Sequence, residues 1–133
     1  LAYYLKQSAP VPQGPVVELF DRNAVAPSAL ISFIYTRIHM FGLPNGEALD
    51  EHPLSSRGLK VHSAFEVKNS SWTRSLEETN SGYREHKPEH FEVLRHFIFT
   101  FRDNTFECLA KDYGVSVNKE SITTLMHVAI DKR

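Results

Sequence analysis

The chain has 133 residues, of which 41% are hydrophobic and 23% are charged, a balance typical of one globular domain. Its 15 basic and 16 acidic residues give a net charge of −1 and are spread along the sequence, without the basic stripe of a nucleic-acid-binding protein. No apolar run reaches the roughly 18 residues of a membrane-spanning helix, and residues 1–7 lack the apolar core of a signal peptide. We therefore expect a cytoplasmic protein of bacterial type, with no nucleic-acid or membrane partner.

Residues 1–15 are expected to form an arm or connector at the start of a single domain. Residues 1–8 suit either an edge strand or a loosely held arm. Residues 8–15 contain three prolines and a glycine, which exclude a helix and a central strand. A β-prone segment, VVELF, follows at 16–20.

Residues 29–41, ALISFIYTRIHMF, allow two interpretations. A strand is favoured by the β-branched and aromatic content of this segment and by the alternation of its side chains. A helix is the alternative, because Ser28 would cap its start and Gly42 follows its end.

Residues 42–60 form a long polar excursion, and connections of this length inside a compact domain are usually functional or disordered. Arg57 can hold a carboxylate or a phosphate through two parallel hydrogen bonds, and Ser55 and Ser56 can add donors. We expect these three residues to contribute to ligand binding. The alternative is a surface loop whose hydroxyl groups bond its own backbone.

One strand and three helices are predicted in the segments that flank the next motif. Residues 61–69 alternate apolar and polar side chains, which indicates a half-buried strand. Ser70 or Ser71 can cap a helix that follows this strand. The three helices are predicted at 70–82, at 88–95 and at 118–133.

Residues 94–110, LRHFIFTFRDNTFECLA, predict a β-hairpin, because Asp103 and Asn104 both tolerate the positive φ of a two-residue turn. This turn makes every pair on one face apolar: Phe101 with Phe106, Phe99 with Cys108, and Phe97 with Ala110. Large residues facing small ones interdigitate without voids. We therefore expect this face to be core and Cys108 to be a buried filler rather than a nucleophile.

The other face of the predicted hairpin mixes polar and apolar pairs: Arg102 with Thr105, Thr100 with Glu107, Ile98 with Leu109, and His96 with Lys111. An apolar pair in a polar frame suits a ligand pocket or a subunit interface. We expect His96, Thr100 and Glu107 to contact a ligand. We also expect a second subunit to cover Ile98 and Leu109, which predicts a homo-oligomer, most often a dimer.

Glu66 and Glu107 are the carboxylates that fall in predicted strands, and a carboxylate with a histidine can act as acid and base. His52, His62 and His96 are the histidines expected to work with them. These five residues are the catalytic candidates.

No metal site is predicted, although the chain has seven histidines. Pro88 starts a helix between His86 and His90, so these two side chains do not share one helical face as a ligand pair would. No further ligands follow at recognisable spacing, and no cofactor is expected.

Three segments within residues 52–110 resemble small bacterial proteins without an assigned activity: HPLSSRGL, FEVKNSSW and HFIFTFRDNTFECLA. The resemblance implies a self-contained bacterial domain and assigns no functional residue.

Together these patterns predict one α+β domain with a mainly antiparallel sheet of four to six strands and two or three helices. The C-terminal helix is expected to pack on the phenylalanine face of the sheet. The first functional hypothesis is a non-enzymatic module that homo-oligomerises and binds a small molecule or a protein. The alternatives are a small hydrolase or isomerase that uses a Glu/His pair, and a partner protein of the immunity or antitoxin type.

Overall fold

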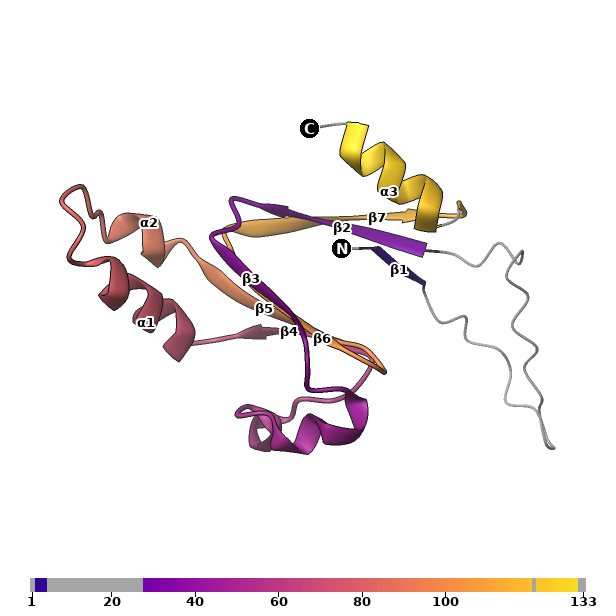
Figure 1. Cartoon of the computed structure of the whole chain (residues 1–133), viewed down its shortest axis with the longest axis horizontal. Helices are drawn as coiled ribbons and strands as arrows, with labels where there is room; N and C mark the ends of the chain where they lie inside the picture. The colour runs from indigo at the N-terminus through magenta and orange to yellow at the C-terminus, as the bar shows by residue number, and fades with distance from the viewer. Residues whose placement is uncertain (1, 5–27, 121, 132–133) are drawn as a thin grey trace. The chain divides into compact units, whose positions relative to one another are not determined.

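The computed structural model describes residues 2–4, 28–120 and 122–131 (Figure 1). The chain divides into two compact units, one made of its two ends and the other spanning Phe33–Tyr113. The α+β class is confirmed, with two antiparallel sheets of three and four strands and three α-helices. No helix in the described ranges is long and apolar enough to cross a membrane. Most of the predicted arm and the VVELF segment lie outside the described residues.

The smaller sheet, which lies mainly in the first unit, has the strand order β1–β2–β7. Its strands are β1 (Ala2–Tyr4), β2 (Ser28–Ile34) and β7 (Asp112–Asn118). β1 is an edge strand, which was one of the two predictions for residues 1–8. The C-terminal helix α3 (Ile122–Asp131) contacts β1, so a C-terminal helix on a sheet is also confirmed, although β1 belongs to this smaller sheet and not to the sheet that carries the phenylalanine hairpin.

The segment 29–41 forms two strands rather than one, and the helical alternative is wrong. β2 ends at Ile34, and β3 (Ile38–Gly42) begins four residues later. Tyr35, between them, has a φ of 56°. This left-handed conformation is incompatible with an extended strand and turns the chain out of the first sheet.

The larger sheet belongs to the second unit and has the order β3–β6–β5–β4. Its other strands are β4 (Ser63–Val67), β5 (Arg95–Thr100) and β6 (Thr105–Ala110). All neighbours are antiparallel. The predicted strand within 61–69 and the predicted hairpin are both present.

The register of the hairpin differs from the prediction by two residues. Phe99 lies opposite Phe106 and Phe97 lies opposite Cys108, whereas the predicted partners were Cys108 and Ala110. On the other face, Ile98 pairs with Glu107 rather than with Leu109. The turn falls at residues 102–103 instead of 103–104. A shift of two residues keeps every side chain on its face, so the faces are as predicted although the partners are not.

One face of the larger sheet is aromatic. Phe97 and Phe99 are buried, and the ring of Phe33 lies 5.3 Å from that of Phe106 and 5.8 Å from that of Phe99, between centroids. Tyr113 meets Phe97 edge to face at 5.0 Å. Cys108 is fully buried on this face, and burial raises the pKa of its thiol to about 12. The prediction of a buried filler is confirmed.

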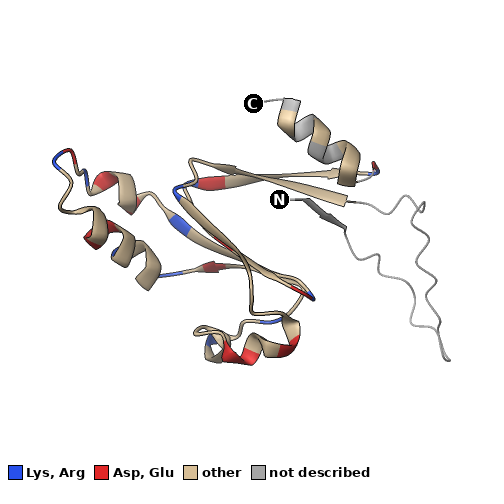
Figure 2. Ribbon diagram, in the orientation of Figure 1, with Lys and Arg blue, Asp and Glu red and all other residues tan. Residues whose placement is uncertain are grey.

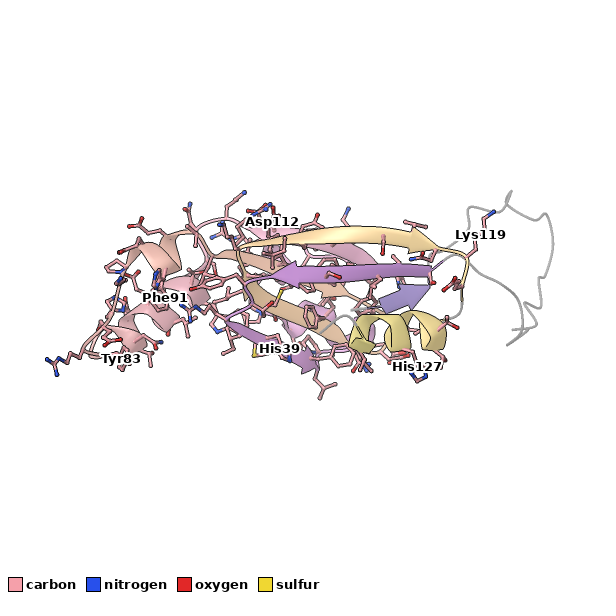
Figure 3. All side chains as sticks on the ribbon, turned by 90° about the horizontal axis from the view of Figure 1, so that it is seen from above. His39, Tyr83, Phe91, Asp112, Lys119 and His127 are labelled. Carbon is pink, nitrogen blue, oxygen red and sulfur yellow. The ribbon has the colours of Figure 1, made fainter. Side chains whose placement is uncertain are left out.

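The opposite face is covered by helices and by the 43–60 loop. The helices are α1 (Ser71–Asn80) and α2 (Glu89–Glu92), and the loop contains the short 3-10 helices η1 (Gly46–Glu51) and η2 (Ser55–Arg57). Trp72 and Leu76 of α1 pack on a cluster of Phe91, Leu94 and Leu109. Phe91 on α2 is marked in Figure 3.

This cover overturns the interface predicted for Ile98 and Leu109. Both side chains have 0% exposure within one chain, so no second subunit reaches them. The prediction treated the hairpin as if few helices were available to cover its second face, whereas α1 and the loop together do so.

Candidate functional site

The candidate site is centred on Glu107, whose carboxylate lies between two histidines on the covered face of the sheet. His52 Nε2 lies 3.0 Å from Glu107 Oε1, and His96 Nε2 lies 2.8 Å from Glu107 Oε2. His52 and His96 are buried, and the Glu107 side chain is 13% exposed. Three of the five catalytic candidates therefore meet at one point, each from a different element: η1's C-terminal end, β5 and β6.

The backbone fixes the tautomer of His52. The Leu54 N–H donates to His52 Nδ1 at 3.0 Å, so that nitrogen carries no proton. The proton of a neutral His52 therefore sits on Nε2 and is donated to Glu107. This bond ties the 43–60 loop to the centre of the sheet.

His96 links Glu107 to a serine. Its Nδ1 lies 2.9 Å from Ser70 Oγ, while its Nε2 faces Glu107. With Nε2 protonated, Nδ1 accepts the hydroxyl proton of Ser70, and every polar atom of the row Ser70–His96–Glu107–His52 is then satisfied. The indole of Trp72 meets the His96 ring edge to face at 5.1 Å and restricts its rotation.

Ser70 is held at the junction between β4 and α1. It is the N-cap of α1, and its Oγ accepts from the Thr73 N–H at 3.3 Å, as predicted for this position. Asn69, just before it, has a φ of 54°, a left-handed conformation that asparagine tolerates better than most residues. This turn aims the Ser70 hydroxyl at β5, where His96 lies.

Two opposing influences set the ionisation of Glu107. Burial is the largest and raises the pKa of this carboxyl group, but the hydrogen bonds from His96 and His52 together outweigh it. The pKa of Glu107 therefore lies below its usual value. Near neutral pH the carboxylate is ionised and accepts from both imidazoles.

A groove of about 380 Å³ runs beside this row, and Ser70 and His96 contribute to its wall. Phe91 and Leu94 add apolar surface, and Lys68 and Arg74 add cationic groups. Its volume lies at the lower end of the range for small-molecule sites, roughly 300–1,000 Å³. Tyr83, in the connection between α1 and α2, is exposed and marked in Figure 3.

Glu66, the other predicted catalytic carboxylate, lies apart from the histidines. Arg95 Nη2 lies 2.8 Å from Glu66 Oε2 and Arg95 Nε lies 3.1 Å from Oε1, while Lys68 Nζ lies 2.6 Å from Oε1. The hydrogen bonds from Arg95, and then from Lys68, lower the pKa of Glu66 to about 2. His62 is exposed and has a φ of 56°. Neither residue joins the Glu107 row.

The predicted ligand-binding residues do not form one cluster. Thr100 is buried, and its hydroxyl donates to the Lys60 carbonyl and accepts from the Ser63 N–H. Arg57 and Ser56 are exposed on the loop, and Ser55 is half-buried in η2. Their neighbour η1 carries three acidic residues, which form the red segments of the loop in Figure 2. Only His96 and Glu107 of this set share the site.

A second surface of interest is the outer edge of β3. β3 pairs with β6 and, within the described residues, has no neighbour on its other side. Met40 is 50% exposed, Phe41 60% and Leu43 84%. The sequence between Ile38 and Asn45 contains no charged residue.

Ser70 was predicted as a helix cap, but its contact with His96 was missed. Ser70 and His96 are 26 positions apart, and His96 and Glu107 are 11 apart. Such spacings follow from the strand pairing and not from any local motif. The signal present in the sequence is a serine at a predicted strand-to-helix junction, followed by a histidine in the next predicted strand along the chain.

No metal-binding cluster of three or more His, Cys, Asp or Glu side chains occurs among the described residues. Comparison of the chain with protein-family models, with curated proteins and with solved structures finds no match.

Proposed function

We propose that the chain is a binding module that assembles with a second copy of itself through strand β3 and takes a ligand in the groove beside Ser70. The observation that carries the assembly is the uncharged, apolar edge of β3. The observation that supports ligand binding is the groove, where apolar and cationic side chains lie next to a polar row.

Exposed strand edges pair readily with other strands, so proteins usually protect them with charges, proline or a covering element. The two edges of the larger sheet differ in this respect. β4 carries Glu66, which is ion-paired with Lys68 just beyond the strand. β3 carries no such charge, and its Met40 and Phe41 are at least half exposed. This contrast favours β3 as the edge that receives a partner.

A second copy fits this edge because the β3 sequence is self-complementary in antiparallel pairing. With Met40 opposite Met40 of the second copy, Ile38 lies opposite Gly42 and His39 opposite Phe41. Ile38 then faces a glycine, the two methionines meet at the centre, and two His39–Phe41 aromatic pairs form across the new contact, each a favourable cross-strand combination. A two-fold symmetric contact of this kind is the commonest form of homo-oligomer.

Sedimentation velocity at protein concentrations from one to several hundred micromolar tests the assembly. We expect a dimer for the native chain and a folded monomer for Met40→Lys, because a lysine on the edge resists pairing. Ala64→Lys is the matched control, since Ala64 is exposed on the opposite edge strand, and it should remain dimeric. A native monomer throughout this range, or a Met40→Lys dimer, would contradict the proposal.

A further inference from the structure

We infer that Ser70 is a nucleophile and that the chain hydrolyses small acyl esters held in the groove. This inference rests on the groove of the proposed function but not on the assembly through β3. It gives the predicted Glu/His pair a partner that the sequence did not reveal. Three features carry it: the proton path from Ser70, the position of Ser70 at a helix start, and the access of its neighbours to the groove.

The proton path is complete in the folded chain. Ser70 Oγ lies 2.9 Å from His96 Nδ1, which accepts its proton, and His96 Nε2 lies 2.8 Å from Glu107 Oε2, which stabilises the imidazolium that results. Activation of a serine by a histidine that a carboxylate orients is the general logic of serine hydrolases. Here the two imidazole nitrogens have exchanged roles, since Nδ1 faces the serine and Nε2 the carboxylate.

Glu107 acts on the reaction through His96 and is therefore a positioning residue. Its second oxygen accepts from His52 Nε2 at 3.0 Å, and the Leu54 N–H holds His52 in the required tautomer. The carboxylate is thus fixed from both sides. Buried, fully bonded rows of this kind keep a base in one orientation with little reorganisation during reaction.

The start of α1 supplies the electrostatic part of the site. The Thr73 N–H already donates to Ser70 Oγ, which stabilises negative charge on that oxygen. The amides of Ser71 and Trp72 precede the first hydrogen bonds within the helix, so they are available to a developing oxyanion. Both the nucleophile and the oxyanion donors therefore lie within one helical turn.

The reaction balances with water as the only co-reactant. Ser70 Oγ attacks the acyl carbon of an ester, and its proton passes to His96 Nδ1. The C–O bond to the leaving alcohol breaks, and the alcohol takes the proton from His96. Water then attacks the acyl-serine, gives its proton to His96 and releases the acid, after which His96 returns the proton to Ser70 Oγ.

The groove restricts the substrate to a short acyl ester. Its volume of about 380 Å³ suits a small molecule, and Phe91 and Leu94 give an apolar wall for a short acyl chain. Ser70 itself is only 8% exposed, which excludes bulky acyl groups at the nucleophile.

A fluorophosphonate probe tests the inference on the intact protein. We expect one adduct per chain, which peptide mass spectrometry places on Ser70. Ser70→Asn should abolish labelling while keeping a good helix cap, and the exposed Ser75→Ala variant on the same helix should label like the native chain. No adduct on folded native protein, or an adduct on any other residue, would overturn the inference.

Hydrolysis of p-nitrophenyl butyrate supplies the second measurement. Ser70→Asn should reduce turnover to the uncatalysed background, and His96→Gln should lower kcat at least about 100-fold, as expected for loss of a general base. Glu107→Gln should lower kcat with KM unchanged, which a merely structural role would not produce. Turnover that survives Ser70→Asn would also overturn the inference. If the native chain is dimeric but neither labelled nor active, the nucleophile is refuted while the assembly stands.

Discussion

Replacing Glu107 with alanine should destabilise the protein by about 3–6 kcal/mol. The carboxylate accepts one hydrogen bond from each of His52 and His96, both of which are buried. Hydrogen bonds to a charged group contribute about 1.5–3 kcal/mol each, and the sum of the two gives the range. The alanine would leave the buried His52 N–H without an acceptor, because the Leu54 N–H fixes the His52 tautomer, and it would leave His96 Nε2 without a partner in either tautomer of His96.

Glu107→Gln should cost less, about 1–3 kcal/mol, because its shape is retained. The side-chain carbonyl of glutamine can accept from His52, whose tautomer is fixed by the Leu54 N–H. Its amide must then donate to His96 Nε2, which is possible if the His96 proton moves to Nδ1 and is donated to Ser70. Both hydrogen bonds are then kept, but neither involves a charged acceptor, and each becomes weaker by about 0.5–1.5 kcal/mol.

The dependence on pH follows from the lowered pKa of Glu107. The folded protein binds this proton more weakly than the unfolded chain, whose carboxyl has the ordinary value of 4.5. The ionised Glu107 carboxylate therefore stabilises the fold fully above pH 4.5, and this stabilisation is lost as the pH falls toward the pKa of Glu107 in the folded protein. The difference in unfolding free energy between the native chain and Glu107→Gln should shrink in this acidic window and stay constant above it.

Urea denaturation followed by circular dichroism, at neutral pH and at steps below the ordinary carboxyl pKa, measures these differences. Glu66→Ala is the matched control, since Glu66 is also a strand carboxylate but pairs with Lys68 and Arg95, which are 76% and 39% exposed. Exposed ion pairs contribute about 0–1 kcal/mol. The reasoning fails if Glu107→Ala costs no more than Glu66→Ala, or if the Glu107→Gln difference does not change with pH.

Two further predictions concern the aromatic face of the larger sheet. Phe99→Ala should lower the unfolding free energy by about 3–5 kcal/mol, because Phe99 is buried among aromatic rings. Phe101→Ala should lower it by only about 1–2 kcal/mol, because Phe101 is half-buried. Equal losses of unfolding free energy for the two variants, measured by urea denaturation, would contradict the position of the turn, because Phe101 would then be as buried as Phe99. Cys108 should resist a thiol reagent such as dithionitrobenzoate in the folded protein and react once urea unfolds the chain. The reason is that Cys108 is fully buried and that burial raises the pKa of its thiol to about 12. Rapid labelling of the folded chain would contradict this prediction.

In the hairpin, the sequence pattern predicted which face each side chain occupies but not which residues lie opposite one another. Alternation of side chains placed Phe97, Phe99 and Cys108 on one face correctly, because the period of a strand is independent of its partner. The partners were wrong because the turn was chosen for residues that tolerate positive φ. In the described chain the non-glycine residues with positive φ are Tyr35, His62 and Asn69, so this turn uses none. Its position is set instead by contacts such as the Phe101 N–H with the Asn104 carbonyl, at 2.8 Å.

The candidate site was predicted only in its components. Glu107 was chosen for its expected strand position, and His52 and His96 were chosen as histidines that could work with it; the three do meet. Their meeting depends on where the 43–60 loop lies, and no local propensity encodes that. The loop is positioned by tertiary contacts: the Gly46 N–H donates to the Arg102 carbonyl at 2.7 Å, and a Cβ at Gly46 would lie 2.6 Å from Val61.

The same dependence on tertiary contacts explains why Ser70 was seen as a cap and not as the partner of a histidine. A cap is a local property that Ser70 and Ser71 offer equally in the sequence. The choice between them is made by Asn69, whose left-handed turn carries Ser70 toward β5, and by Trp72, whose ring confines His96. Ser70 is therefore buried beside a histidine, and Ser71 is exposed at the same helix start. The Ser70–His96 contact thus depends on a single left-handed residue. A change at Asn69 that straightens the turn should remove this contact while leaving either serine able to cap α1.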